Sequence, residues 1–386
     1  MSDPIYLDHN ATTPVDPEVV EAMLPWLKEH FGNPSSTHVY GLRAHDAVEQ
    51  ARGLVAALLG CHADEVFFTS GGTEANNLAI RGVAKALAPR RKHVLTSQVE
   101  HPATARPCEN LQREGWQLTL VPVDVQGRVT VEDVRPFVRG DTALVTVMLA
   151  NNETGTIMPI GDLADTAHAK GALMHTDAAQ AVGKISVRVD ELGVDLLSVA
   201  GHKFYAPKGV GALYVRRGTP IRPLLLGGGH EQGLRPGTEN VPHIVGLGKA
   251  CEIASRDLAT EEERMRNLRD ELWRLLKLKV PGTRLNGHAT KRLPNTLNVS
   301  FPGTSGTALL AAAPTVAAST GSACHEDVES PSEVLTAMAL DAATALGAVR
   351  LSLGRGTSQD DVRKAADALI QAWREVAAAG QASDGC

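Results

Sequence analysis

The sequence has few cysteines, no long apolar run and no excess of basic residues, and each shortage argues against a class of protein. Its five cysteines are an odd set without a C-x-x-C pair, which argues against a disulfide framework and against a thiolate zinc site. We therefore expect no metal centre. No stretch of about 18 apolar residues occurs, and residues 1–10 contain no basic segment followed by an apolar one. We expect no membrane span and a cytoplasmic location.

The charge balance restricts the partners. The 38 basic and 44 acidic residues are intermixed and give a formal net charge of −6. No basic stripe is present that could neutralise the phosphates of a nucleic acid. Small molecules or other proteins are therefore the expected partners, without direct nucleic-acid binding.

Short apolar strands alternate with helices over the first two thirds of the 386 residues. We expect strands at 66–70, 93–97, 117–123, 143–150, 172–176, 196–200 and 211–217. This alternation is typical of an α/β fold with a mainly parallel sheet covered by helices on both faces. From about residue 240 a long charged helical stretch precedes strands near 295–301, 316–320 and 349–353. These later elements predict a second, smaller α+β domain, joined to the first by a helix near residues 250–260.

Polar residues follow five of the expected strands, at the edge of an open α/β sheet where ligands bind. They are Gly72 and Thr73, His101, Asn152, Asp177 with Gln180, and His202 with Lys203. Gly72 and Thr73 open a helix, whose free N–H groups favour a phosphate. Taken singly, each position has an ordinary explanation as a glycine turn, a helix cap or a polar loop. Taken together, they are groups of complementary chemical type that chance turns would seldom supply.

One cofactor uses all of these groups. Pyridoxal phosphate needs a lysine for its Schiff base, a carboxylate for its pyridinium nitrogen and a cradle for its phosphate. Lys203 could otherwise be a solvated cap at the end of a strand. A lysine in a partly desolvated, cation-rich pocket has a lowered amine pKa, which suits imine formation and proton transfer. The sequence therefore predicts pyridoxal phosphate bound at Lys203.

Cys324 differs from the other four cysteines. Small residues surround it in STGSACHED (319–327) and leave its sulfur unshielded, whereas Cys61, Cys108 and Cys251 lie beside or within helix-like segments. Cys386 ends a polar tail. Cys324 is therefore the candidate for a reactive thiol.

Ten stretches distributed over nearly the whole chain carry a family resemblance. They are YLDHNATTP (6–14), FGNPSS (31–36), FTSGGTEANNLAI (68–80), EHPA (100–103), NNETG (151–155), HTDAAQAVGK (175–184), GHKFYAPKGVGALYVRR (201–217), GGGHEQGLRPGTENV (227–241), STGSACH (319–325) and VRLSLGR (349–355). Together they resemble the class V aminotransferases, specifically the group I (NifS/IscS-like) cysteine desulfurases. The resemblance implies a fold-type I transferase that depends on pyridoxal phosphate. It also implies a large cofactor-binding domain at residues 15–255 and a small domain at 1–14 and 256–386 that carries the Cys324 loop.

The resemblance also implies how the cofactor is held. Lys203 is expected to form the Schiff base, and Asp177 to pair with the pyridinium nitrogen. Gln180 is expected to hydrogen-bond the phenolate oxygen, while His101 stacks on the ring and assists proton transfer. The groups implied to bind the cofactor's phosphate, or to lie near the cofactor, are Gly72, Thr73, His202, Asn152 and Thr238. Thr238 is expected to reach the phosphate of the other subunit, which implies a homodimer.

The substrate implied by the resemblance is L-cysteine. Arg350 is expected to bind its carboxylate bidentately, a task for a planar guanidinium, and Asn33 and Asn152 to position it. The thiolate of Cys324 would attack the substrate sulfur, releasing alanine and leaving a persulfide on the enzyme. The persulfide would pass to an acceptor protein of iron–sulfur cluster assembly or of tRNA or DNA thiolation.

Two other functions stay open from the sequence. Bacterial iron–sulfur members usually have a serine three residues before the lysine, where this chain has Ala200. The stretches VAGHKFY, RPGTEN and ACH also resemble selenocysteine lyases, whereas the spacing in HEDVESPSEVL (325–335) favours cysteine as substrate. A catalytically silent scaffold or carrier is the alternative from another class, and the presence of every residue that the chemistry needs argues against it.

Overall fold

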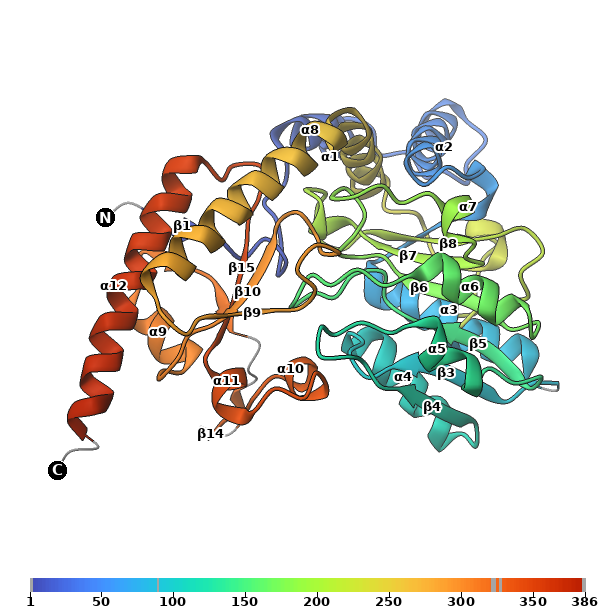
Figure 1. Cartoon of the computed structure of the whole chain (residues 1–386). Coiled ribbons are helices and arrows are strands. Elements are labelled where there is room, and N and C mark those ends of the chain that lie inside the picture. The colour runs from blue at the N-terminus through green and yellow to red at the C-terminus, as the bar shows by residue number, and fades with distance from the viewer. Residues whose placement is uncertain (1–2, 89, 321–323, 326–327, 384–386) are drawn as a thin grey trace.

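Seven strands lie side by side in the larger sheet (Figure 1). In this computed structural model, which describes residues 3–88, 90–320, 324–325 and 328–383, their order is β2-β8-β7-β6-β5-β3-β4. The bounds are β2 Val66–Thr69, β3 His93–Ser97, β4 Gln117–Val121, β5 Thr142–Thr146, β6 Leu173–Asp177, β7 Leu196–Ala200 and β8 Gly211–Val215. Strands β3 to β7 pair in parallel, and only the pairings of β8 with β7 and β2 are antiparallel. The predicted mainly parallel sheet is confirmed.

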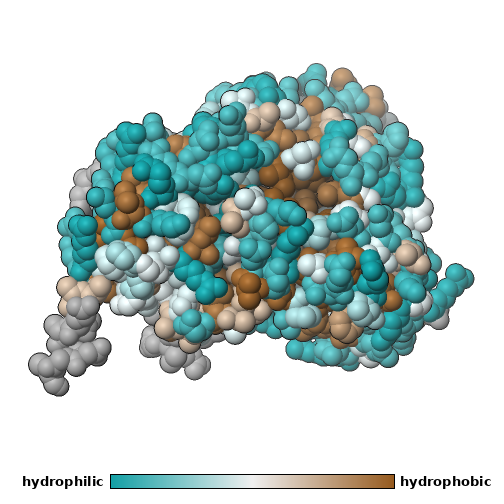
Figure 2. Space-filling model, in the orientation of Figure 1, coloured by the Kyte–Doolittle hydropathy of each residue, from teal (hydrophilic) through white to brown (hydrophobic). Residues whose placement is uncertain are grey.

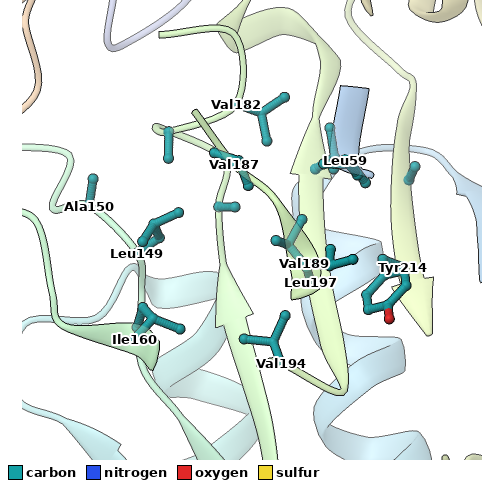
Figure 3. Close-up of a cluster of buried hydrophobic side chains, with 14 of the residues drawn as sticks. Leu59, Leu149, Ala150, Ile160, Val182, Val187, Val189, Val194, Leu197 and Tyr214 are labelled. Carbon is teal, nitrogen blue, oxygen red and sulfur yellow. The ribbon is translucent and has the colours of Figure 1, made fainter. Parts of the chain in front are cut away.

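Helices cover both faces of this sheet, and most of its strands are therefore buried on both sides. Helices α3 (Gly72–Leu87) and α4 (Pro102–Arg113) share a core with one face. The other face packs against α1 (Pro17–Lys28), α2 (Val39–Leu59), α5 (Val131–Val134), α6 (Ile160–His168), α7 (Val189–Leu192) and the start of α8 (Val241–Lys279). Figure 3 shows part of this second core, where Leu59 of α2 lies near Leu197 and Tyr214 of the sheet.

The later part of the chain forms a four-stranded antiparallel sheet in the order β12-β15-β10-β9. Its strands are β9 (Arg284–Asn286), β10 (Thr296–Ser300), β12 (Ser319–Thr320) and β15 (Ala348–Ser352). Helices α9 (Gly306–Ala312) and α12 (Gln359–Ser383) share its core with the second half of α8. A short pair, β13 (Cys324–His325) with β14 (Val328–Glu329), is followed by α10 (Glu333–Ala337) and α11 (Ala342–Leu346). The predicted smaller α+β part is present.

Two segments connect the sheets. Strand β1 (Ile5–Tyr6) pairs in parallel with β11 (Val316–Ala317), so the N-terminal residues lie beside the smaller sheet. Helix α8 has 39 residues and passes from the core of the larger sheet to that of the smaller one, beside α12 (Figure 1). The domain division at residues 14/15 and 255/256 stays a prediction.

Hydrophilic and hydrophobic residues are unevenly distributed over the surface. Figure 2 shows a face that is mainly hydrophilic, with hydrophobic residues gathered in separate patches. Within the ranges described above, no helix has both the length and the apolar character needed to cross a bilayer. The cytoplasmic location stays a prediction.

Candidate active site

A cavity of about 380 Å3 lies where the carboxyl ends of β6 and β7 meet the start of α3. This is the edge at which open α/β sheets bind ligands. The predicted site residues that line it are Gly72, Thr73, His101, Asn152, Asp177, Gln180, His202, Lys203 and Arg350. Gly72 and Arg350, 278 positions apart in the chain, therefore line one cavity, and so do the polar residues that follow the five expected strands.

Lys203 ends a single 3-10 turn, Gly201–Lys203, directly after β7. Its Nζ donates to the carbonyl oxygens of Asn10 and Ala11, both at 2.8 Å. Burial, assisted by the Arg350 cation, lowers the pKa of its amine to about 8, against the opposing effect of Asp177. About a tenth of such an amine is neutral at pH 7, so Lys203 is suited to attack a carbonyl carbon.

Asp177 is the last residue of β6 and is buried. Its Oδ2 accepts a hydrogen bond of 2.6 Å from Nδ2 of Asn76, and its Oδ1 accepts one of 2.9 Å from the backbone of Ala179. Asn76 is a site residue that sequence reasoning missed, although it lies three positions after Thr73 and so nearly on the same face of α3. These bonds fix the carboxylate in place beside the cavity. A carboxylate that pairs with a pyridinium N–H needs such a fixed position.

The N-terminus of α3 forms a cradle for an anion. Its N-cap Gly71 has φ of 144° and no side chain to cap the first N–H groups, which are left for a ligand and carry the positive end of the helix dipole. A Cβ added to Gly72 would lie 3.1 Å from the Cβ of Ala200, so this turn packs closely against the end of β7. An amine, a fixed carboxylate and an anion cradle thus surround one cavity, and this donor set fits pyridoxal phosphate.

Two histidines line the cavity with lowered pKa values. His101 caps α4, because its Nδ1 accepts a hydrogen bond of 3.1 Å from the backbone of Ala103. A neutral ring in this arrangement carries its proton on Nε2. Burial, together with the Lys203 cation and against Asp177, lowers the pKa of His101. Burial and the same cation lower the pKa of His202 to about 4. Both rings are therefore neutral at pH 7.

Arg350 lies on β15 and reaches the cavity from the smaller sheet. One terminal nitrogen donates to Oδ1 of Asp8 at 2.6 Å, and the other donates to the carbonyl oxygen of Asn152 at 3.1 Å. The second oxygen of Asp8 accepts a hydrogen bond of 2.8 Å from Ser319. The Nε of Arg350 is buried and has no hydrogen-bond partner among the described residues. The guanidinium is thus held in a fixed orientation with an N–H available to a carboxylate.

Three predicted residues do not line this cavity in the structure. Asn33 is exposed and accepts a hydrogen bond of 2.9 Å from the backbone of Ser35. Thr238 is exposed in the segment that follows the 3-10 turn Glu231–Gly233. The backbone of Cys324 belongs to β13, and its side chain lies outside the described part of the chain. The roles of these residues, like those of the cavity residues, stay predictions.

The other described cysteines are poor nucleophiles. Cys108 and Cys251 are free and buried, and burial raises the pKa of each thiol. Burial also raises the pKa of Cys61 to about 12. In the described ranges no three or more His, Cys, Asp or Glu side chains gather in a way that could hold a metal ion.

The chain is similar to known proteins over most of its length. The family described as aminotransferase class V matches residues 5–364. The chain is 48% identical to the cysteine desulfurase IscS of Dictyoglomus turgidum over 96% of its length and 94% of that protein. Among solved structures, a NifS-like protein is similar with a TM-score of 0.89 and 39% identity, over 95% of this chain and 98% of that one. A structure described as SspA in complex with cysteine is similar with a TM-score of 0.78 and 37% identity, over 90% and 98% of the two chains.

Proposed function

The chain belongs to the class V aminotransferase family and is a cysteine desulfurase that depends on pyridoxal phosphate, and we propose that it forms a persulfide on Cys324. The convergence of Lys203, Asp177 and the start of α3 on one cavity supports this proposal. In the proposed reaction L-cysteine and the Cys324 thiol give L-alanine and a Cys324 persulfide. One C–S bond and the S–H bond of Cys324 break, and one S–S bond and one C–H bond of the alanine methyl group form. The proton lost by the thiol balances the one gained by carbon, so no further oxidant or reductant is needed.

The protein residues have distinct tasks around the cofactor. Bound pyridoxal phosphate would supply an electron-withdrawing ring that stabilises negative charge on the substrate carbon. We propose that Lys203 anchors it and moves a proton at the substrate Cα, for which an amine pKa of about 8 is suited. Asp177 accepts the pyridinium N–H, and Gln180 donates to the ring oxygen. His101 provides a neutral ring for stacking and leaves its Nε2 for proton exchange. The phosphate is held by Gly72, Thr73 and His202.

Substrate binding uses the smaller sheet. We propose that Arg350 holds the carboxylate of L-cysteine, since its Nε is buried and lacks a partner in the described structure. Asn152 is held by the same guanidinium through its carbonyl oxygen and helps to position the substrate, with Asn33. The smaller sheet thus supplies the proposed contact with the substrate carboxylate, whereas Lys203 and Asp177 lie at the larger sheet.

A homodimer is part of the proposal. Phe31 and Tyr40 are 82% and 52% exposed, and their rings stack with centroids 5.5 Å apart. Leu226 is 84% exposed. Large apolar side chains in solvent favour association with another protein surface. Thr238, also exposed, would then be free to reach the phosphate in the other subunit.

The sulfur acceptor is proposed to be a protein. The net charge of −6 disfavours direct contact with nucleic acid. Candidate acceptors are proteins of iron–sulfur cluster assembly and enzymes of tRNA or DNA thiolation. Incubating the persulfide form with each class of acceptor, with sulfur transfer followed by mass spectrometry, would distinguish them.

Alanine release from L-cysteine and from L-selenocysteine, supplied separately, tests the proposed function. We expect Cys324→Ala to lose about 100-fold or more of its activity on cysteine. The control Cys61→Ala should keep its activity, since burial raises the pKa of that thiol to about 12. Full activity of Cys324→Ala on cysteine would refute the proposal. A wild-type enzyme far faster on selenocysteine would favour a selenocysteine lyase instead.

A further inference from the structure

Lys184 is a second lysine beside the proposed cofactor site. Its Nζ donates to Oε1 of Gln180 at 2.8 Å and to Oδ1 of Asn10 at 3.0 Å. It forms no salt bridge within the described residues. Burial, with the cations Lys203 and Arg350, lowers the pKa of its amine well below the usual value. Burying an amine without a carboxylate costs free energy, so this position needs an explanation.

Glu261 and Glu262 of α8 line the same small cavity as Lys184, but neither forms a salt bridge with it in the described structure. Two further groups nearby are His9 and His202, and Lys184 lowers the pKa of both. The partners of the amine are therefore two neutral amides, those of Gln180 and Asn10. Lys184 offers N–H donors to both oxygens whether it is charged or neutral.

Lys184 and the carbonyl oxygen of Asn10 together decide which way the Gln180 amide is turned. The two ends of an amide have nearly the same shape, and only their hydrogen bonds distinguish them. Because a lysine donates, the atom 2.8 Å from Lys184 must be the oxygen. The amino group is then turned the other way, where one N–H donates to the carbonyl oxygen of Asn10 at 2.9 Å. The second N–H is left for a group in the cavity that Gln180 lines.

Lys184 also holds Asn10, on which Gln180 and Lys203 both depend. The carbonyl oxygen of Asn10 accepts hydrogen bonds from Gln180 at 2.9 Å and from Lys203 at 2.8 Å. The side-chain oxygen of Asn10 is fixed by Lys184 and by Nδ2 of Asn295 at 3.2 Å. Asn10 is therefore one of the residues that hold the N-terminal segment against the cavity wall.

We propose that Lys184 is a positioning residue that turns the Gln180 amide so that its N–H donates to the ring oxygen of bound pyridoxal phosphate. The inference rests on the proposed function and adds a residue that does not itself line the main cavity. Without Lys184, only the carbonyl oxygen of Asn10 holds the Gln180 amide, so the amide can rotate and donate less well to the negatively charged ring oxygen. The loss of that donor raises the affinity of the site for a proton.

The cofactor's visible absorption band reports this effect without any measurement of turnover. We titrate the band of the cofactor-loaded enzyme with pH and take the pH at which its change is half complete as the midpoint. We expect Lys184→Met to raise this midpoint by about one unit, the size expected when one hydrogen bond to a charged group is lost. The thermal midpoint of the same samples monitors folding. A folded Lys184→Met enzyme with the wild-type midpoint would overturn the inference.

A double-mutant cycle separates positioning from a direct charge effect. In a Gln180→Leu enzyme no amide remains to be turned, so we expect Lys184→Met to add no further shift. A shift of undiminished size in that background would overturn the inference. The isosteric Gln180→Glu variant keeps an oxygen for Lys184 but has no N–H, so it should also raise the midpoint. An unchanged midpoint in Gln180→Glu would count against the role of the donor.

Failure of the proposed function has a different signature. The wild-type enzyme must show a visible band that Lys203→Ala lacks. If it does not, the proposed function fails and this inference falls with it. If the band is present and Lys203-dependent but does not respond to Lys184→Met, the inference alone fails.

Discussion

Single residues set the reactivity of the site through their neighbours. The pKa of Lys203 is lowered to about 8, chiefly by burial and then by the Arg350 cation. The neutral amine captures a carbonyl group, and its fraction rises as the pH rises through the pKa. We predict that the cofactor-free enzyme takes up pyridoxal phosphate faster with increasing pH, with a midpoint near 8 in the growth of the visible absorption.

The Arg350→Leu variant is the matched control for this pH dependence. Removing the cation should move the midpoint upward, because the protonated amine is then less disfavoured. A wild-type midpoint near the ordinary lysine value of about 10.5 would contradict the prediction.

Substrate recognition is the second effect at this scale. Arg350 already donates to Asp8 and to Asn152, and it has an N–H to spare. A lysine cannot hold three partners in this planar arrangement. We predict that Arg350→Lys raises the KM for cysteine about 10- to 100-fold, the loss expected for a charge-assisted hydrogen bond. The exposed Arg363→Lys change should leave KM unaltered, and equal effects of the two would refute this assignment.

At the scale of elements, the contact between β7 and α3 controls phosphate binding. Ala200 ends β7 and lies against Gly72 at the start of α3. A serine there would place a hydroxyl beside the anion cradle. We predict that Ala200→Ser tightens pyridoxal phosphate binding about 3- to 10-fold by equilibrium dialysis, the value of one hydrogen bond. Ala200→Val adds bulk without a donor and should weaken binding, so tighter binding by both variants would contradict this explanation.

The strands and their polar ends could be predicted from local sequence, because each is a short apolar run that ends at a turn. Local detail differs where a single residue interrupts a pattern. The pattern of residues 131–138 predicts one helix, but α5 ends at Val134 and the chain continues as the 3-10 turn Arg135–Phe137, since Pro136 has no N–H to donate.

The supporting residues of the site could not be predicted in this way. Asn76 contacts Asp177 across 101 positions of the chain, Lys184 contacts Asn10 across 174, and Asp8 contacts Arg350 across 342. No periodicity within one element encodes such contacts, because they depend on how elements pack. Asn10 lies in YLDHNATTP, a stretch that carries the family resemblance without indicating the role of this residue.

Across the whole molecule, the site depends on how the two sheets are held together. Lys203 and Asp177 come from the larger sheet, whereas Arg350 comes from the smaller one. Helix α8 contributes to both cores, and its central residues near Thr260 are exposed. The alignment of substrate and cofactor groups therefore rests partly on the stiffness of this helix.

We predict that Thr260→Pro weakens the binding of cysteine much more than the binding of pyridoxal phosphate. A proline inside the helix removes a hydrogen bond and kinks the axis, at a cost of about 3 kcal/mol, without touching either core. The KM for cysteine should rise at least about 10-fold, while the affinity for pyridoxal phosphate changes less than about 3-fold, since most of its proposed contacts lie on one side. Thr260→Ala, which keeps the helix, should behave as wild type. A parallel loss of cofactor and substrate binding would show that α8 supports the larger sheet itself rather than the alignment between the sheets.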